Sequence, residues 1–530
     1  MIVVRETRHD TYGLSTLPEE ERYRDDVSRV ARGAGITSFG QGASRVLSYA
    51  SQVALARMYG AAQLGLYVLG TTLVVMANVL AQIGMDNGVV RYVAHYRVEK
   101  DVARMRGIIL LALWISFGLS LVLAGLMFFS AGFLADKVYN KPSLEILIRV
   151  FSVSLPFFTL MSMTLWSLQG FQNVRYPTYV RQILQPLVNL VLVVLFYLLG
   201  AQVIGAAAAY ALSMVGGSVL ALYYLKRVFP RFLDRAVPAK FETRALLEAS
   251  GPMIVANVTN QIYPWTTVTV LGIFAGAETV GLYQVAARTA AFSQLALIAF
   301  VSIFTPMASR LYRSGSLDHL GYLYKDVSRW IFTGSLAFFL LTVSLSRDIL
   351  VVFGKEFVSG WPAMVMIAGA YLFGSSVGLT GRILAMTGHQ TMVMLATLGA
   401  GAAGIVCAFA LVPRYGLLGA AVATTGAIVL SNGTTLFSVR KLFGFWPYNR
   451  GYLKSVAAGV CATIVAYLGK LVLPLSPGIL TILVLAPLFM VVFAALLFVM
   501  GLSPSDRQFL APFLAKIRRI TRRDTRAAPE

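Results

Sequence analysis

Two arginines lie deep inside apolar segments of the sequence. Arg45 falls near the middle of the predicted helix 34–58, and Arg288 near the middle of 277–307. A charged side chain at the centre of a bilayer costs about 3 kcal/mol or more, so it should face a water-filled cavity or a partner. Guanidinium groups bind phosphate through several donors at once, so the expected ligand of such a cavity is an anion that carries phosphate.

No acidic partner is expected for these arginines. All 23 acidic residues fall in predicted tails, loops or helix ends, so neither arginine has a carboxylate at its own depth. Asp86, within the segment 84–88, is expected to be a turn or cap residue. The alternative for the arginines is snorkelling toward the membrane surface, which the depth of Arg45 makes strained.

Polar side chains accompany Arg45 along one face of its helix. Ser38, Gln41, Arg45, Ser48 and Gln52 are separated by three or four residues, which places them on one side of a helix. Amides recur on two other apolar helices, at Asn257 and Gln261 in 246–272 and at Gln182, Gln185 and Asn189 in 178–199. For the amides, hydrogen bonding between helices is an equal alternative to substrate contact. We predict a substrate cavity lined by Arg45, Arg288, Gln41, Gln52, Asn257, Gln261 and Gln185.

The composition requires a membrane. Of the 530 residues, 57% are hydrophobic and 13% are charged, and the mean hydropathy is +0.72. Soluble domains carry about 25% charged residues. Apolar segments of this length suit helices rather than barrel strands, and backbone groups in lipid must be satisfied internally. We therefore predict an all-α integral membrane protein with about fourteen transmembrane helices, at 34–58, 62–84, 107–130, 145–167, 178–199, 203–225, 246–272, 277–307, 328–350, 360–384, 390–412, 416–438, 452–473 and 477–501.

Basic residues are distributed unevenly between the loops on the two sides. One set of loops contains 22 Lys and Arg residues, and the other contains 8. The positive-inside rule puts the first set in the cytoplasm, so both termini are cytoplasmic and the number of spans is even. The expected location is the inner (plasma) membrane. The net charge of +22 is explained by this topology and by anionic headgroups, without a nucleic-acid partner.

The second half of the sequence repeats the first at an offset of 216 residues. The segment 60–67 (GAAQLGLY) matches 276–283 (GAETVGLY), and the same offset carries Gly200 onto Gly416. Each repeat holds six spans, so both enter the membrane in the same direction and form two parallel six-helix lobes. The expected parts are a cytoplasmic N-terminal tail 1–33, a six-helix lobe 34–227, a basic cytoplasmic linker 228–245, a six-helix lobe 246–440, two C-terminal helices in 451–501, and a basic cytoplasmic tail 502–530.

Metal, cofactor and catalytic sites are not expected. The two cysteines lie in apolar spans and the four histidines are scattered, at Cys407, Cys461, His9, His95, His319 and His389. A membrane enzyme such as a glycan polymerase or ligase would need clustered catalytic residues, usually in a large external loop. The longest external segment, about 131–145, carries no such cluster, so no enzymatic activity is expected.

Short motifs in a fixed order carry a resemblance to a known family. They are Gly65 and Tyr67, Gly84-Met85-Asp86 with Arg91-Tyr92, Leu168-Gln169, and Tyr415-Gly416 followed by Gly419. Over about residues 30–500 the chain resembles the polysaccharide-biosynthesis (O-antigen type) flippases of the multidrug/oligosaccharidyl-lipid/polysaccharide exporter (MOP) superfamily. The lipid II flippases of peptidoglycan synthesis share the fourteen-helix plan and remain a close alternative.

The resemblance implies a transport function. The expected substrate is a polyprenyl diphosphate-linked oligosaccharide, which would move from the inner to the outer leaflet by alternating access for cell-surface polysaccharide synthesis. Membrane lipids are expected partners, and a polysaccharide polymerase and glycosyltransferases are further candidates. A multidrug or cation antiporter of the same superfamily is a second alternative. By family resemblance such exporters use buried carboxylates, and the sequence places no acidic residue at the centre of a span.

Overall fold

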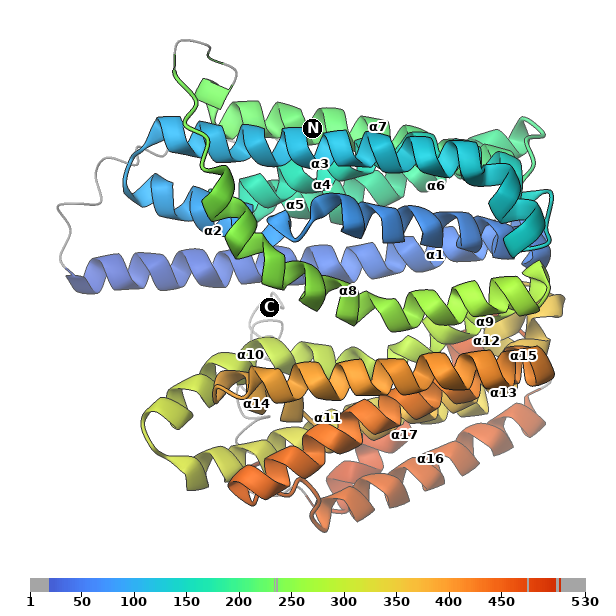
Figure 1. Cartoon of the computed structure of the whole chain (residues 1–530). Coiled ribbons are helices and arrows are strands. Elements are labelled where there is room, and N and C mark those ends of the chain that lie inside the picture. The colour runs from blue at the N-terminus through green and yellow to red at the C-terminus, as the bar shows by residue number, and fades with distance from the viewer. Residues whose placement is uncertain (1–18, 233, 235–236, 474–475, 502–504, 507–530) are drawn as a thin grey trace, which may run out of the picture. The chain divides into compact units, whose positions relative to one another are not determined.

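The computed structural model describes residues 19–473 apart from 233 and 235–236, together with 476–501 and 505–506. This described part of the chain is helical and contains no strand (Figure 1). The first eighteen residues of the predicted tail 1–33 and most of the tail 502–530 lie outside the described residues. The remainder of the first tail is helical, because α1 begins at Glu19.

The first half of the chain forms helices connected by short turns. The α-helices are α1 (Glu19–Gln82), α2 (Met85–Val98), α3 (Val102–Phe133), α4 (Leu144–Gly170), α5 (Arg175–Pro177), α6 (Gln185–Leu198), α7 (Val203–Val228) and α8 (Thr243–Phe274). Two π-helical turns, η2 (Leu134–Val138) and η3 (Thr178–Leu184), and the 3-10 turn η4 (Pro230–Phe232) lie between them.

The second half follows the same pattern. Its α-helices are α9 (Ala277–Ala290), α10 (Leu295–Arg313), α11 (Leu317–Ser344), α12 (Ser346–Val351), α13 (Trp361–Val377), α14 (Thr380–Met386), α15 (Gln390–Phe443), α16 (Gly451–Val472) and α17 (Ile479–Val499). The 3-10 turns are η5 (Ala291–Gln294) and η6 (Lys355–Gly360).

Eleven helices in the described part of the chain are long and apolar enough to cross a membrane. Two of them, α1 and α15, each cover two predicted spans, because the backbone breaks at Gly60 and at Gly416. The predicted span 246–272 falls in α8, of which 264–274 is a shorter apolar helix. The multi-span helical fold is confirmed, whereas the count of fourteen stays a prediction.

The repeat is visible in local backbone geometry. Gly200 and Gly416, which are 216 residues apart, have φ angles of 78° and 52°. Each lies at the junction between two consecutive helices, and side chains other than glycine rarely adopt a positive φ. The sequence match at this offset therefore corresponds to the same turn requirement in both halves.

The chain divides into two compact units. Of the described residues, those of 19–52, 77–129 and 149–254 form unit 1, and those of 53–76, 130–148 and 255–506 form unit 2. The core of unit 1 is formed by apolar side chains of α2, α3, α4 and α7. The predicted linker folds back onto this unit, because Arg106 donates from Nε to the carbonyl of Phe232 at 3.0 Å.

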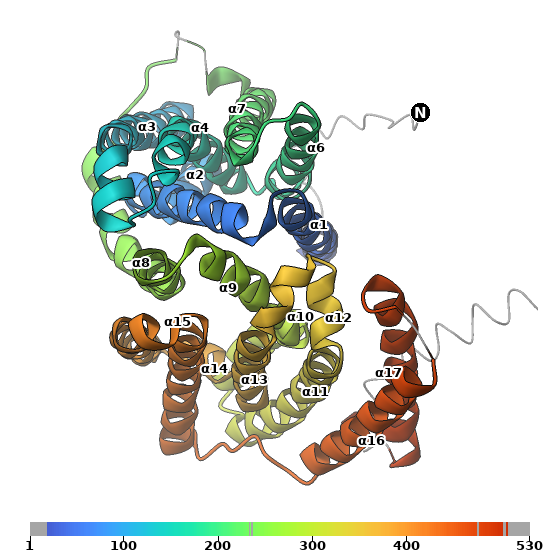
Figure 2. The same cartoon turned by 90° about the vertical axis from the view of Figure 1, so that its right-hand side faces the viewer.

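Unit 2 combines most of the C-terminal half with two short segments of the N-terminal half. Its helices α10, α11 and α14 share one apolar cluster around Tyr324. A second cluster joins α11 to the paired helices α16 and α17, which lie side by side in Figure 2. Small side chains at Ala458 and Ala462 allow this close approach, as is usual between membrane helices.

Candidate functional site

The predicted cavity residues of unit 1 differ in exposure. Gln41 is exposed, Arg45 is half-buried, and Gln52 is only 4% exposed. Both polar atoms of the Gln52 amide are buried without a hydrogen-bond partner among the described residues. Gln185 is engaged, because its Nε2 donates to Ser213 Oγ at 3.1 Å. Gln185 thus makes the hydrogen bond between helices that was the alternative to substrate contact, whereas Gln52 makes no such bond in the described part of the chain.

The other three predicted residues belong to unit 2. Asn257 is half-buried, and Gln261 and Arg288 are exposed. Arg288 lies on α9 seven residues after Gly281, so the two positions share a helix face. The predicted set is thus divided between the two units, and its assembly into one cavity stays a prediction.

Helices of the two sequence repeats meet inside unit 2 at a pair of glycines. A Cβ atom on Gly65 of α1 would lie 1.7 Å from the carbonyl oxygen of Ala277. A Cβ on Gly281 of α9 would lie 2.1 Å from the carbonyl oxygen of Ala61. Gly65 and Gly281 are 216 residues apart, as are Ala61 and Ala277, so each pair occupies equivalent positions in the two repeats. The two helices therefore touch through backbone, in a contact that is the same from either side.

Arg57 joins the first part of α1 to the end of α12. Its Nε donates to the carbonyl of Val352 at 2.7 Å, and its Nη2 to the carbonyl of Val351 at 3.0 Å. These carbonyls lie at a helix C-terminus, where acceptors lack partners and the helix dipole favours a cation. The contact joins residues almost 300 positions apart in the sequence.

Glu356 makes the complementary contact at a helix start. The break at Gly60, where φ is 77°, exposes the amide of Ala61 at the beginning of the second part of α1. Glu356 Oε1 accepts a hydrogen bond from this amide at 2.9 Å. A carboxylate at a helix N-terminus satisfies a free donor and complements the dipole.

Lys141 makes a third contact of this kind, at the C-terminal end of α8. Its Nζ donates to the carbonyls of Gly272 at 2.6 Å and Ala275 at 2.9 Å, at the end of α8. Burial lowers the pKa of this ammonium below its ordinary value. We call these contacts the repeat seam, defined by Arg57, 60–65, Lys141, 272–281 and 351–356. The predicted topology puts all of these residues on the outer side.

Unit 1 contains a half-buried cluster of charged and polar side chains that no sequence motif marked. Arg181, which falls in the predicted span 178–199, lies on the π-helical turn η3. Its Nη2 donates to Ser162 Oγ at 3.0 Å, and its guanidinium stacks 5.3 Å from the ring centroid of Trp166. Its charge interacts with Asp86, which is 8% exposed in the first turn of α2. The cap role predicted for Asp86 is not seen, because the N-cap residue of α2 is Gly84 and no side-chain cap hydrogen bond is made there among the described residues.

Unit 2 also contains a partly open cavity of about 260 Å³ that was not predicted. Its lining is mainly apolar and includes Pro264 and the polar side chains of Gln294, Tyr371, Thr397 and Asn432. Asn432 uses Nδ2 to bond the carbonyl of Ile428 at 2.8 Å. These positions come from four separate helical segments, which explains why no local sequence pattern marks them.

Comparison with known proteins gives a consistent set of similarities. Residues 30–312 match the family described as polysaccharide biosynthesis protein. The chain is 26% identical over 222 residues to the probable low-salt glycan biosynthesis flippase Agl15 of Haloferax volcanii, and the match covers 41% of this chain and 46% of that relative. The chain thus spans less than half the length of this relative. It is 25% identical over 417 residues to stage V sporulation protein B of Bacillus subtilis, covering 73% of this chain and 79% of that one.

Solved structures share the fold. One is a lipid II flippase MurJ in an inward closed conformation, with a TM-score of 0.70 and 16% identity over 90% of this chain and 99% of that chain. Another is a multidrug resistance MATE family transporter of the MOP superfamily in an inward-facing conformation, with a TM-score of 0.61 and 16% identity, covering 80% and 96%. At such identities the similarity concerns the fold and does not extend to the substrate.

Proposed function

The chain belongs to the polysaccharide biosynthesis protein family, and we propose that it moves a polyprenyl diphosphate-linked oligosaccharide from the inner to the outer leaflet. Its relatives and its fold indicate a membrane transporter of the MOP superfamily type, related to flippases rather than to enzymes. The single observation that carries the proposed substrate is the family match over residues 30–312. Transport requires a path across the membrane, and in our proposal the repeat seam and the two arginines belong to that path.

The repeat seam supports alternating access. Its polar contacts are hydrogen bonds between three charged side chains and helix termini: Arg57 and Lys141 donate to carbonyls, and Glu356 accepts from an amide. Arg57 and Glu356 are exposed. Contacts of charged groups exposed to water contribute about 1 kcal/mol or less each. A seam held by a few such contacts and a glycine crossing can separate without unfolding either helix. In our proposal the seam closes the outer side while substrate enters from the cytoplasm.

We propose that Arg288 meets the substrate when the seam is closed. It lies two helical turns from Gly281 on the same face of α9. In our proposal it binds one phosphate of the diphosphate, and Arg45 of α1 binds the other. A hydrogen bond from a charged donor contributes about 1.5–3 kcal/mol, so loss of either arginine should impair export strongly.

Cation-coupled drug export is the second candidate, and the Asp86 cluster argues against it. An antiporter of that kind needs a carboxylate that can take up the coupling cation. Asp86 is a buried carboxylate of unit 1, but its charge already interacts with Arg181. A cation bound at Asp86 would have to compete with a guanidinium that is fixed by Ser162 and Trp166.

The test is complementation of surface glycan export in a deletion strain, with the level of membrane protein measured alongside. We expect the double variant Arg45→Ala/Arg288→Ala to lose most export, and lysine at both positions to retain part of it. Arg414→Ala, which removes an exposed arginine of α15, serves as the matched control and should export normally. Full export by the double alanine variant would refute the role given to the two arginines.

A further inference from the structure

A second cavity of unit 2, of about 640 Å³, lies where α16 begins and α17 ends. It is lined by residues of α10, of the first half of α11, of the beginning of α16 and of the end of α17, together with Gly501, Ser505 and Asp506. Phe300, Trp330 and Leu497 contribute apolar surface, whereas Arg329, Arg450 and Lys454 contribute cations. None of these residues belongs to the predicted substrate cavity or to the repeat seam.

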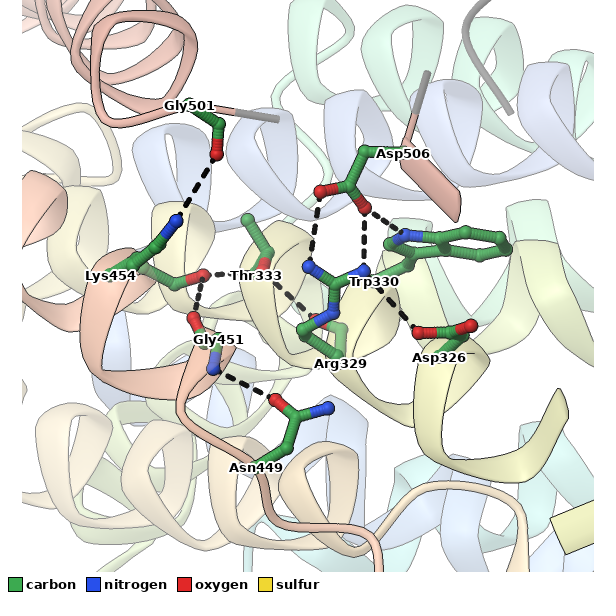
Figure 3. A network of polar contacts seen from close by, with 10 residues as sticks. Asp326, Arg329, Trp330, Thr333, Asn449, Gly451, Lys454, Gly501 and Asp506 are labelled. Carbon is green, nitrogen blue, oxygen red and sulfur yellow. Dashed lines mark hydrogen bonds and ion pairs between the residues drawn. The ribbon is translucent and has the colours of Figure 1, made fainter. Parts of the chain in front are cut away.

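One wall of the cavity is a charge-balanced network. Arg329 donates from Nη2 to Asp506 Oδ1 at 2.7 Å and from Nη1 to Oδ2 at 3.0 Å. Trp330 Nε1 donates to the same carboxylate at 2.7 Å, and Asp326 lies 3.4 Å from Arg329 Nη2. Figure 3 shows the guanidinium between these two carboxylates. The charge of Arg329 is therefore compensated within the protein, and its role in the wall is to fix Asp506.

The remaining two cations of the lining have no acidic partner among the described residues. Lys454 donates from Nζ to the carbonyls of Met500 at 3.1 Å and Gly501 at 3.3 Å, which leaves its full charge. Arg450 is exposed and makes no hydrogen bond or ion pair in the described part of the chain. It immediately precedes Gly451, the first residue of α16, where the helix dipole adds positive potential. This side of the cavity attracts an anion.

The position of the cavity suggests which anion is available. α16 begins and α17 ends beside it, so it lies at the level of a membrane surface. The predicted topology makes this the cytoplasmic surface, where anionic lipids are concentrated. The apolar side chains of Phe300 and Leu497 would suit the glycerol and first acyl carbons. We propose that this cavity binds the phosphate headgroup of an anionic glycerophospholipid, with Arg450 and Lys454 as the phosphate ligands.

Binding of acyl-labelled phosphatidylglycerol to the purified full-length protein in detergent tests this site. Each cation near a headgroup contributes a factor of about five in affinity. Arg450→Gln/Lys454→Gln should therefore weaken binding about 25-fold. The matched control is Arg310→Gln/Lys441→Gln, which removes two exposed cations of the same predicted side that do not line the cavity. It should bind as tightly as the unmodified protein.

Competition distinguishes the ligand, and a charge-preserving variant guards against misfolding. Unlabelled phosphatidylglycerol should displace the probe, whereas phosphatidylcholine, inorganic phosphate and diphosphate should not. Arg450→Lys/Lys454→Arg should bind normally, and the glutamine pair should unfold at the same temperature as the unmodified protein in phosphatidylcholine. Equal affinity of the glutamine pair and its control would overturn the site. Displacement by inorganic phosphate at similar concentrations would overturn the assignment to a lipid.

Discussion

Gly65 and Gly281 occupy equivalent positions in the two repeats and face each other's helices reciprocally. A Cβ on either residue would lie within about 2 Å of a backbone carbonyl oxygen of the opposite helix, at Ala277 or at Ala61. Real Cβ atoms do not approach backbone so closely, and backbone cannot move aside as a flexible side chain can. The two positions therefore require glycine for a reason that involves the partner helix.

We expect Gly65→Ala and Gly281→Ala to destabilise the protein by about 1–3 kcal/mol each, because overpacking forces the helices apart. Thermal unfolding of the purified protein measures this effect. The control is Gly118→Ala in α3, where an added Cβ meets no atom within 4 Å. This change should leave stability unchanged or raise it slightly, because alanine favours a helix. Equal unfolding temperatures for all three variants would contradict the close crossing.

The charged contacts of the seam predict a change in accessibility. Leu69 is 1% exposed and lies beside Gly272 in unit 2. We expect Leu69→Cys to react slowly with an impermeant maleimide in intact cells and faster when Arg57→Ala and Glu356→Ala are added. The background must lack Cys407 and Cys461, because both are exposed. Ala112→Cys, which is equally buried in unit 1, is the control and should stay unreactive.

Unchanged labelling of Leu69→Cys after both seam substitutions would show that these contacts do not hold the outer side closed. The result is informative only with folded protein, so the same variants should retain their level in the membrane. Lys141→Ala provides an independent approach to the seam, because it removes the contacts to Gly272 and Ala275 at the end of α8.

The Arg181 cluster predicts a large stability effect from a residue outside the proposed substrate path. Arg181 donates a charge-assisted hydrogen bond to Ser162 and lies near the buried carboxylate of Asp86, and a hydrogen bond of a charged group contributes about 1.5–3 kcal/mol. Arg181→Met should therefore lower the unfolding temperature markedly, and Asp86→Asn in the same chain should restore most of it. Arg175→Met, at an exposed position of α5, is the control. A double variant no more stable than Arg181→Met would exclude an interaction with Asp86.

The predicted topology can be tested by cysteine labelling from outside. Lys137 and Lys355 are exposed in the structure and belong to predicted outer segments. Cysteine at either position should react in intact cells, whereas cysteine at Lys100, which is also exposed, should react only after the membrane is opened. Position 235, also predicted to be cytoplasmic, lies outside the described residues. Labelling at 100 or 235 in intact cells would contradict the predicted orientation of the chain in the membrane.

Hydropathy and the repeat predicted the helical membrane fold, because both depend on local sequence. The contacts that shape the site did not follow from them. Arg57 binds backbone carbonyls at 351 and 352, and a backbone acceptor leaves no signature in the sequence. Arg181 lies in the predicted span 178–199, but its contacts with Ser162 and Trp166, on another helix, required the structure. The motif glycine Gly65 was recognised, but its contact with Ala277 required the structure.

Proteins of the MOP superfamily fold serve different substrates, so the central claim is the identity of the transported molecule. For the most direct measurement, the purified protein is reconstituted in liposomes that carry a fluorescent polyprenyl diphosphate oligosaccharide. Quenching from outside then follows the movement of this lipid between the leaflets. We expect movement with the unmodified protein and with Arg414→Ala, and little movement with Arg45→Ala/Arg288→Ala. Movement of lipid II or a cationic dye in place of this substrate would contradict the account.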